Sequence, residues 1–321
     1  MQEKALERNP LPPPMSAEQI RQRAATEAAE AARIDAEAEG KAEASAIVQA
    51  RLEEQAQYEA EAKMAAQARQ MDRVKRETSA EVQAMLDEEA RTVALANSYR
   101  KAAAEGDAGA QYNLGMMYDL GRGVAQNYTV AAGWYLKAAA QGNVKAQFAL
   151  GVMNELGHGM PRSDQEAVTL YREAAAGGYA KAQHSLGAMY YRGKGVQQDY
   201  RSAAEWESKA SVQGIAEAQS DLGTMYALGQ GVAQSYSSAV EWYRNAAEQG
   251  FAEAQRNLGG MYADGLGIKA DLVQAYMWFN LAALSGNENA RKDMQNLWNR
   301  MSHEQIMQAR QLAQEWLEKH K

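Results

Sequence analysis

A unit of 36 residues recurs without insertion along this 321-residue chain, and that period constrains the fold more than any other feature. Five tandem copies occupy residues 107–286, and a half copy with Tyr99, Ala102 and Ala103 precedes them. The period is marked by five Leu-Gly pairs, Leu114-Gly115, Leu150-Gly151, Leu186-Gly187, Leu222-Gly223 and Leu258-Gly259. Repeats of this length are typical of architectures in which each unit packs on its neighbours. The sequence therefore predicts an array of stacked units.

The first half of each unit has the pattern of an amphipathic helix. An Ala, a Leu four residues later and a Met three residues after that share one helical face, which we expect to be buried. The first such stripe is Ala110, Leu114 and Met117. The Gly after each Leu costs about 1 kcal/mol relative to Ala inside a helix. These glycines therefore predict the close approach of another helix.

The second half of each unit predicts a second, antiparallel helix. A Gly-x-Gly step ends the first helix, and its first glycine is suited to a left-handed C-terminal cap. Four residues after the second glycine stands a side chain that can cap the next helix. These caps are Asn127, Ser163, Asp199, Ser235 and Asp271. The second helices carry Ala at two fixed positions, the first of which are Ala131 and Ala138. Each unit is thus predicted to be a helical hairpin that must stack to bury its apolar face.

The repeated motif, A-x-A-Q-x-x-L-G-x-M-Y-x-x-G-x-G-V-x-Q-x-Y-x-x-A-x-x-W-Y-x-x-A-A-x-x-G, resembles the Sel1-like repeat family, relatives of the tetratricopeptide repeats. The resemblance covers about two thirds of the chain when the C-terminal tail is included. It implies an all-α fold, a right-handed α-solenoid of helix-turn-helix repeats. Leu170 stands where other units have Trp, and Glu207 replaces the adjacent aromatic residue. We expect these two departures only to weaken local packing.

The segments on either side of the repeats have different compositions. Residues 1–15 are a Pro-rich leader, and residues 16–98 contain no Pro and one Gly, which predicts a long N-terminal helical arm. A capping box at Ser16 would open the arm. Its heptad pattern is poor, so a solvated helix and a self-associating coiled coil both stay open. Residues 287–321 predict C-terminal capping helices, the last opened by a capping box at Ser302 and running through Trp316.

Motifs that carry chemistry are few, and the sequence predicts that the protein is not an enzyme. The chain has no Cys and four His, none with a second His at helical spacing, so we expect no metal and no cofactor. His158 and His184 occupy slots that vary between units, which indicates surface positions. Ser98 and Lys101 have the Ser-x-x-Lys spacing of penicillin-binding enzymes, but the accompanying motifs are missing.

Positions that vary between units on one face of the first helices are the candidates for binding. In tetratricopeptide-like arrays the first helices line the concave surface, so the resemblance places these residues in a groove. The candidates are Tyr112, Met116, Asp119, Phe148, Val152, Glu155, His184, Tyr191, Arg192 and Arg256. An apolar partner helix or peptide is expected at the N-terminal end of the groove. The alternatives are packing of these side chains against neighbouring helices, or occupation of the groove by the chain's own helix near residues 80–98.

The leading functional prediction is a non-enzymatic protein-interaction scaffold or adaptor that binds a partner peptide or helix in this groove. One alternative is an oligomeric structural component assembled through the arm. Another is a hydrolase acting on cell-wall or β-lactam substrates, an activity assigned to some Cys-rich members of the family that the motif resembles. The net charge of −7 argues against nucleic acid as a partner, and no apolar run is long enough for a transmembrane segment. The expected location is cytoplasmic, or periplasmic or secreted if a signal peptide is missing from this sequence.

Overall fold

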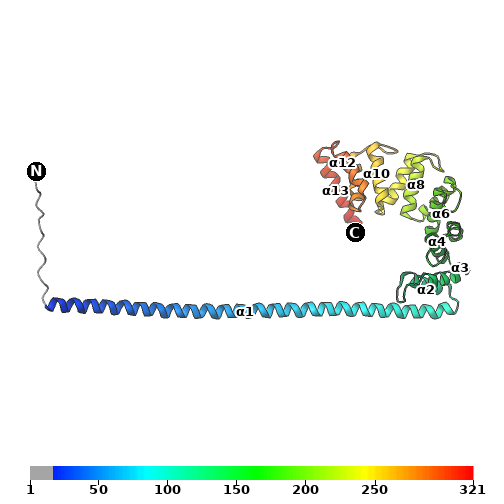
Figure 1. Ribbon diagram of the computed structural model, residues 1–321. Helices are drawn as coiled ribbons and strands as arrows, with labels where there is room; N and C mark the ends of the chain where they lie inside the picture. The colour runs from blue at the N-terminus through cyan, green and yellow to red at the C-terminus, as the bar shows by residue number, and fades with distance from the viewer. Residues whose placement is uncertain (1–16, 321) are drawn as a thin grey trace, which may run out of the picture. The chain divides into compact units, whose positions relative to one another are not determined.

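The computed structural model describes residues 17–320, which form helices joined by short turns, with no strand in that range (Figure 1). The helices are α1 Ala17–Ala104, α2 Ala108–Leu120, α3 Tyr128–Ala140, α4 Val144–Leu156, α5 Asp164–Ala176, α6 Ala180–Arg192, α7 Tyr200–Val212, α8 Ala216–Leu228, α9 Tyr236–Glu248, α10 Ala252–Asp264, α11 Leu272–Leu284, α12 Glu288–Trp298 and α13 His303–Lys319. The chain divides into two compact units, one ending at Met85 and the other beginning at Leu86. The all-α prediction is confirmed.

The first unit is the N-terminal part of α1, and it has the helical structure predicted for the arm. Every side chain described between residues 17 and 85 is exposed. Ion pairs along the helix are long and solvated, such as Arg73 Nε to Glu77 Oε1 at 3.6 Å. The leader at residues 1–15 and the capping box at Ser16 lie outside the described residues. The helical state of the arm therefore comes from local propensity, because no described side chain of this segment is buried.

The second unit contains the repeats, and its helices begin and end where the sequence predicts. The first glycine of each Gly-x-Gly step has a left-handed backbone and caps the first helix. Each predicted side-chain cap accepts a hydrogen bond from the backbone N–H three residues ahead. The Ala, Leu and Met stripes of the first helices are at most 6% exposed in all five units. The two Ala positions of each second helix are fully buried. Helical hairpins with a shared apolar face are thus confirmed.

The glycine after each buried Leu makes room for a side chain of the second helix. A Cβ built on Gly151 would lie 2.5 Å from the Tyr171 ring, and one on Gly259 would lie 2.7 Å from the Phe279 ring. Real Cβ atoms do not approach other atoms this closely, so only glycine fits. The predicted close approach is confirmed, and its partner is the side chain at one fixed position of the second helix, which is aromatic in four units and Glu207 in the third.

Successive units are also joined by a repeated pair of glutamine hydrogen bonds. Gln183 is buried and donates from Nε2 to the carbonyl oxygen of Ala175 in the preceding unit at 3.2 Å. Gln213 of the next second helix then donates to Gln183 Oε1 at 2.7 Å. The same two bonds recur two units before and one unit after. The second unit lacks them, because Gly177 stands at the position of Gln213 and Gln147 donates to Glu173 instead. We call this series the glutamine ladder. It satisfies buried polar groups that would otherwise destabilise the interfaces between units.

Residues 92–104 of α1 take the place of the second helix of a unit that would precede the first repeat. Ala103 is buried against Ala110 and Leu114, and Tyr99 packs at the edge of the same cluster. Gly123 lies against the Thr92 backbone in the way that Gly159 lies against Tyr128 one unit later. The idea that the chain's own helix occupies the groove is therefore wrong for this segment. It is held by the packing of the half unit instead.

The C-terminal helices cover the last repeat. The capping box at Ser302 is present and opens α13, which extends three residues past Trp316. The α13 helix packs against α11, where Trp316 meets the ring of Trp278 at 6.1 Å and donates from Nε1 to Glu248 at 2.9 Å. Ile306 is buried in the same core. Of the described helices, none is both long enough and apolar enough to cross a membrane.

Candidate functional site

Two cavities lie at equivalent positions, each between the first helices of consecutive units. One, of about 120 Å³, lies between α6 and α8 and reaches Glu207 of α7. The other, of about 390 Å³, lies between α10 and α12 and reaches Phe279 of α11. Glu207 and Phe279 are two units apart and occupy the same position of the repeat. The crevices between first helices are therefore a repeated structural feature whose lining changes from unit to unit.

Four of the predicted groove residues lie in or beside these crevices. Tyr191 and Arg192 line the smaller cavity, and Arg256 lines the larger one. Arg256 Nε donates to Asp293 Oδ2 at 2.7 Å, across from α10 to α12. His184 is 25% exposed and is bonded to Glu207 of the smaller cavity. The position of these four residues is consistent with a binding surface made by the first helices.

The remaining six predicted residues come from the first two units and are engaged mainly with their own hairpins. The ring of Tyr112 meets that of Tyr135 at 5.7 Å, and Phe148 meets Tyr171 at 5.5 Å. Met116 is 36% exposed, whereas Val152 is partly buried. Packing of Tyr112 and Phe148 on neighbouring helices, one of the alternatives stated above, is what the structure shows.

The acidic members of this group accept hydrogen bonds from the aromatic residues of the second helices. Asp119 Oδ2 accepts from Tyr135 at 3.3 Å, and Glu155 Oε2 accepts from Tyr171 at 2.8 Å. Lys194 Nζ, from the loop of the next unit, donates to Glu155 Oε1 at 2.7 Å. Burial alone would raise the pKa of Glu155, but the bonds from Lys194 and Tyr171 outweigh it and lower the pKa below 4.5. Glu155 thus ties two units together in its ionised form.

Replacing Glu155 with Gln should lower the free energy of unfolding by about 1–2 kcal/mol at neutral pH, because charge-assisted hydrogen bonds become neutral. Because the pKa of Glu155 is lower in the folded state than in the unfolded state, the ionised group stabilises the fold above pH 4.5. That contribution disappears as the pH falls through the pKa of the folded state. The free energies of unfolding of wild type and Glu155→Gln, measured by urea denaturation between about pH 8 and about pH 3, should therefore converge at acid pH. Glu241→Gln, on an exposed position, is the control. A difference that stays constant with pH would contradict the assigned ion pair.

The third unit departs from the others at two positions that contact each other. Where the other second helices have Tyr135, Tyr171, Tyr243 and Phe279, this unit has Glu207, which is 2% exposed. Glu207 Oε2 lies 2.9 Å from Nδ1 of His184, which occupies the slot of Tyr112 and Phe148. A hydrogen-bonded acid and imidazole thus replace the pair of tilted aromatic rings found in the first two units. Two observations therefore correct the sequence interpretation: His184 is not a free surface residue, and Glu207 is not only a packing defect.

The surroundings of this pair change the acid–base properties of both groups. Burial raises the pKa of Glu207 to about 7, against the opposing effect of His184. Burial would lower the pKa of His184, but the hydrogen bond and charge of Glu207 outweigh it and raise the pKa. Asp221 of α8 extends the cluster, with Oδ2 4.0 Å from His184 Nδ1. The third unit therefore brings one imidazole and two carboxylates together at the smaller cavity.

The cluster was not predicted, because histidine spacing along a single helix does not reveal it. His184, Glu207 and Asp221 come from α6, α7 and α8, so their separations in sequence follow no helical period. The signal was present in the alignment of the units, since both His184 and Glu207 depart from the aromatic type in the same unit. Two departures that face each other indicate a specific contact.

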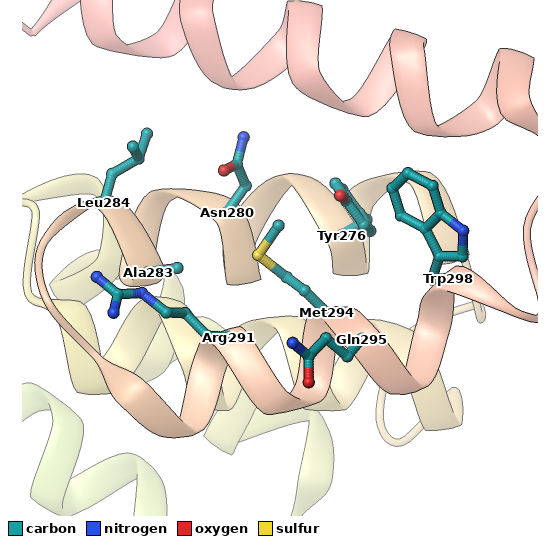
Figure 2. A pocket seen from close by; sticks show the side chains of 8 residues that line it. All are labelled: Tyr276, Asn280, Ala283, Leu284, Arg291, Met294, Gln295 and Trp298. Carbon is teal, nitrogen blue, oxygen red and sulfur yellow. The ribbon is translucent and has the colours of Figure 1, made fainter.

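A third cavity, of about 640 Å³, lies at the C-terminal end of the array between α11 and α12. Figure 2 shows its side chains, which come from both helices and include Tyr276, Met294 and Trp298. Leu284 and Trp298 are 64% and 47% exposed. None of the predicted groove residues lines it, so it is a separate apolar hollow at the last repeat.

The comparisons with known proteins agree with this architecture. The family model described as Sel1 repeat matches residues 108–143, 144–179, 180–214, 216–251 and 252–287. A solved Sel1 repeat protein from Oxalobacter formigenes is 36% identical, with a TM-score of 0.59, and the match covers 68% of this chain and 87% of that one. The search of curated proteins found no match.

A second solved structure is the protective antigen c5321 of uropathogenic Escherichia coli, which displays an SLR fold. It is 36% identical with a TM-score of 0.62, and the match covers 68% of this chain. This chain spans less than half of the antigen, 46% of its length. The five matched repeats make up more than half of the sequence, and their hairpins have the geometry described above. The chain therefore belongs to the Sel1 repeat family.

Proposed function

We propose that the protein is a non-enzymatic interaction scaffold that binds a partner peptide or helix along the crevices between its first helices. Proteins of this family generally serve as protein-interaction scaffolds and are typically non-catalytic. The observation that carries the proposal is the pair of equivalent cavities with different linings on one repeated frame. A constant frame with variable lining is the arrangement by which repeat arrays acquire specificity for one partner.

The lining of the crevices indicates what kind of partner segment would bind. The smaller cavity joins the acidic groups Glu207 and Asp221 to Tyr191, and the larger one joins Arg256 to Asp293. Charged groups of both signs alternate with aromatic and aliphatic surface along the first helices. Such a surface favours a partner segment with mixed charges and one or two apolar anchors, in which charge pairing sets the register.

Site-specific photocrosslinking in the native cell tests this proposal. A photoreactive amino acid would replace Arg192, which is exposed and lines the smaller cavity, and in a second protein Lys137, which is exposed on a second helix. We expect a discrete adduct from position 192 and none from position 137. The captured partner, once purified, should bind Arg192→Glu protein at least ten-fold more weakly than wild type and bind Lys137→Glu protein normally. Adducts of equal yield from both positions would rule out the crevice as the binding surface.

Self-association through the arm is the second candidate, and exposed apolar side chains on α1 favour it. Met64, Met71, Val74, Val82 and Met85 are between 48% and 72% exposed in the first unit. Burying such residues between two helices would stabilise a dimer or larger assembly. Sedimentation of the full chain over a range of concentrations measures it. Molecular mass that stays monomeric at the highest concentration would exclude this role.

A further inference from the structure

We propose that His184, Glu207 and Asp221 form a binding site for a divalent transition-metal ion, with Zn²⁺ as the best match. The three residues each offer one ligand atom, and these atoms all lie within 4.8 Å of one another. No other grouping of this kind occurs among residues 17–320 that the structure describes. The site shares Glu207 and Asp221 with the lining of the smaller cavity, but ion binding by the three residues does not depend on the proposed partner.

The distances between the ligand atoms fit a tetrahedral ion after small movements. Bonds of 2.0–2.2 Å in a tetrahedron place the ligand atoms about 3.3–3.5 Å apart. His184 Nδ1 lies 2.9 Å from Glu207 Oε2 and 4.0 Å from Asp221 Oδ2. The first distance is slightly shorter and the second slightly longer than the tetrahedral separation. Asp221 can close the longer gap, because its side chain is 55% exposed and makes no other hydrogen bond or ion pair in the described part of the chain. Glu207 and His184 are already held in place by packing.

The donor set is one that zinc accepts. One neutral imidazole nitrogen with two carboxylate oxygens supplies three protein ligands, as in catalytic zinc sites, which keep the fourth position open. The bound ion would take the place of the proton that now lies between His184 Nδ1 and Glu207 Oε2. The carboxylate of Glu217 adds a third negative charge near the cluster. The exposed guanidinium of Arg192 offsets only part of this negative charge. The local charge therefore favours a cation.

Glu207 has a second carboxylate oxygen beside the cavity. The carboxyl group is 2% exposed, yet only Oε2 has a hydrogen-bond partner among the described residues. The other oxygen, Oε1, lies against Gly187, where a Cβ would be 2.6 Å away, and the residue lines the 120 Å³ cavity. Because Glu207 lines the cavity, this second oxygen is available to a bound ion or to its water.

The cavity beside the cluster has room for the fourth ligand. A volume of about 120 Å³ holds several water molecules at about 30 Å³ each, and Tyr191 and Thr224 supply polar atoms at its wall. At the equivalent position two units later, Arg256 takes the place of His184 and forms a direct ion pair with Asp293 at a cavity that Phe279 also lines. No metal ion is needed there to join the two first helices. Only the third unit combines a metal-binding nitrogen with a buried carboxylate below it.

Zinc titration of the untagged full chain by calorimetry, with Co²⁺ absorption as a second readout, tests the site. We expect one equivalent of Zn²⁺ and the visible bands of tetrahedral cobalt in wild-type protein. Asp221→Asn, at a half-exposed position, should weaken binding at least ten-fold without changing the thermal midpoint of the metal-free protein. The double variant His184→Phe/Glu207→Phe, which restores two aromatic residues as found in other units, should bind no ion at this site.

The matched control is His158→Gln, which removes a histidine that stacks on Tyr128 away from the cluster and should leave binding unchanged. Because the double variant is expected to fold, loss of binding there would not reflect unfolding, and thermal melting monitored by circular dichroism verifies this. The proposal is overturned if wild type takes up no more metal than the double variant. It is equally overturned if Asp221→Asn protein binds zinc and cobalt as tightly as wild type.

Discussion

Replacing His184 with Phe should lower the free energy of unfolding by about 3–5 kcal/mol, the range found when one partner of a buried ion pair is removed. Glu207 is 2% exposed, and His184 is the only described residue that hydrogen-bonds to it. Without the imidazole the carboxyl group would have to be buried either charged and alone or protonated. Either state costs free energy that the unfolded chain does not bear. Urea denaturation in the presence of a chelator measures the loss without a contribution from metal.

The control for this result is the double variant His184→Phe/Glu207→Phe. It recreates an aromatic pair like Phe148 and Tyr171, whose ring centroids lie 5.5 Å apart, and it keeps Gly187, which leaves room for a ring. Replacing a buried ion pair by well-packed apolar groups is neutral or stabilising by about 1–4 kcal/mol. We therefore expect the second substitution to reverse the damage of the first. If the double variant were as unstable as His184→Phe, the loss would come from overpacking and not from the isolated carboxyl group.

Replacing Gly231 with Ala is the second large effect, with an expected loss of about 3–4 kcal/mol. Gly231 has a φ of +72°, which costs an L-residue about 1–2 kcal/mol. A Cβ at this position would also overlap with the backbone carbonyl of Tyr200, the first residue of α7 in the preceding unit. Backbone atoms cannot move aside as a side chain can, so the loop or the helix must shift, which adds about 1–3 kcal/mol.

Gly250→Ala separates the two contributions. Gly250 also has a positive φ, of +84°, but no atom lies within 4 Å of the position that its Cβ would occupy. Its substitution should cost only the conformational strain, about 1–2 kcal/mol. The difference between the two variants in chemical denaturation then measures the contact between consecutive units. Equal losses would show that the approach to Tyr200 does not contribute to stability.

Most of the fold could be predicted because its determinants are local and occur five times. Side-chain caps such as Asn127, glycine caps such as Gly121 and the Leu and Met stripes act within one helix or one turn. Comparison of the units with each other separated these fixed positions from the variable ones. The C-terminal capping box at Ser302 was recognisable for the same reason. The long arm followed from composition alone, because helix propensity does not require a partner.

The candidate site was less accessible to sequence reasoning. The rows of variable residues were found, but a helical wheel does not tell whether Tyr112 faces solvent or the ring of Tyr135. The contact of His184 with Glu207 joins residues 23 positions apart on two helices, and the choice of partner depends on side-chain rotamers. The binding role of the ten groove residues stays a prediction, because position along a crevice does not by itself demonstrate a partner.

The apolar contacts between neighbouring units are the same throughout the array, whereas the glutamine ladder is not. The first, third and fourth units have both glutamine bonds, the second has neither, and the fifth keeps only the bond from Gln255 to the Ala247 carbonyl. All five units share the buried Ala, Leu and Met stripe and a glycine that lies against the backbone of the preceding unit. A lineage that gains or loses a whole unit therefore keeps these apolar junctions. The length of such a protein can change in steps of one hairpin, while the chemistry of each crevice diverges independently.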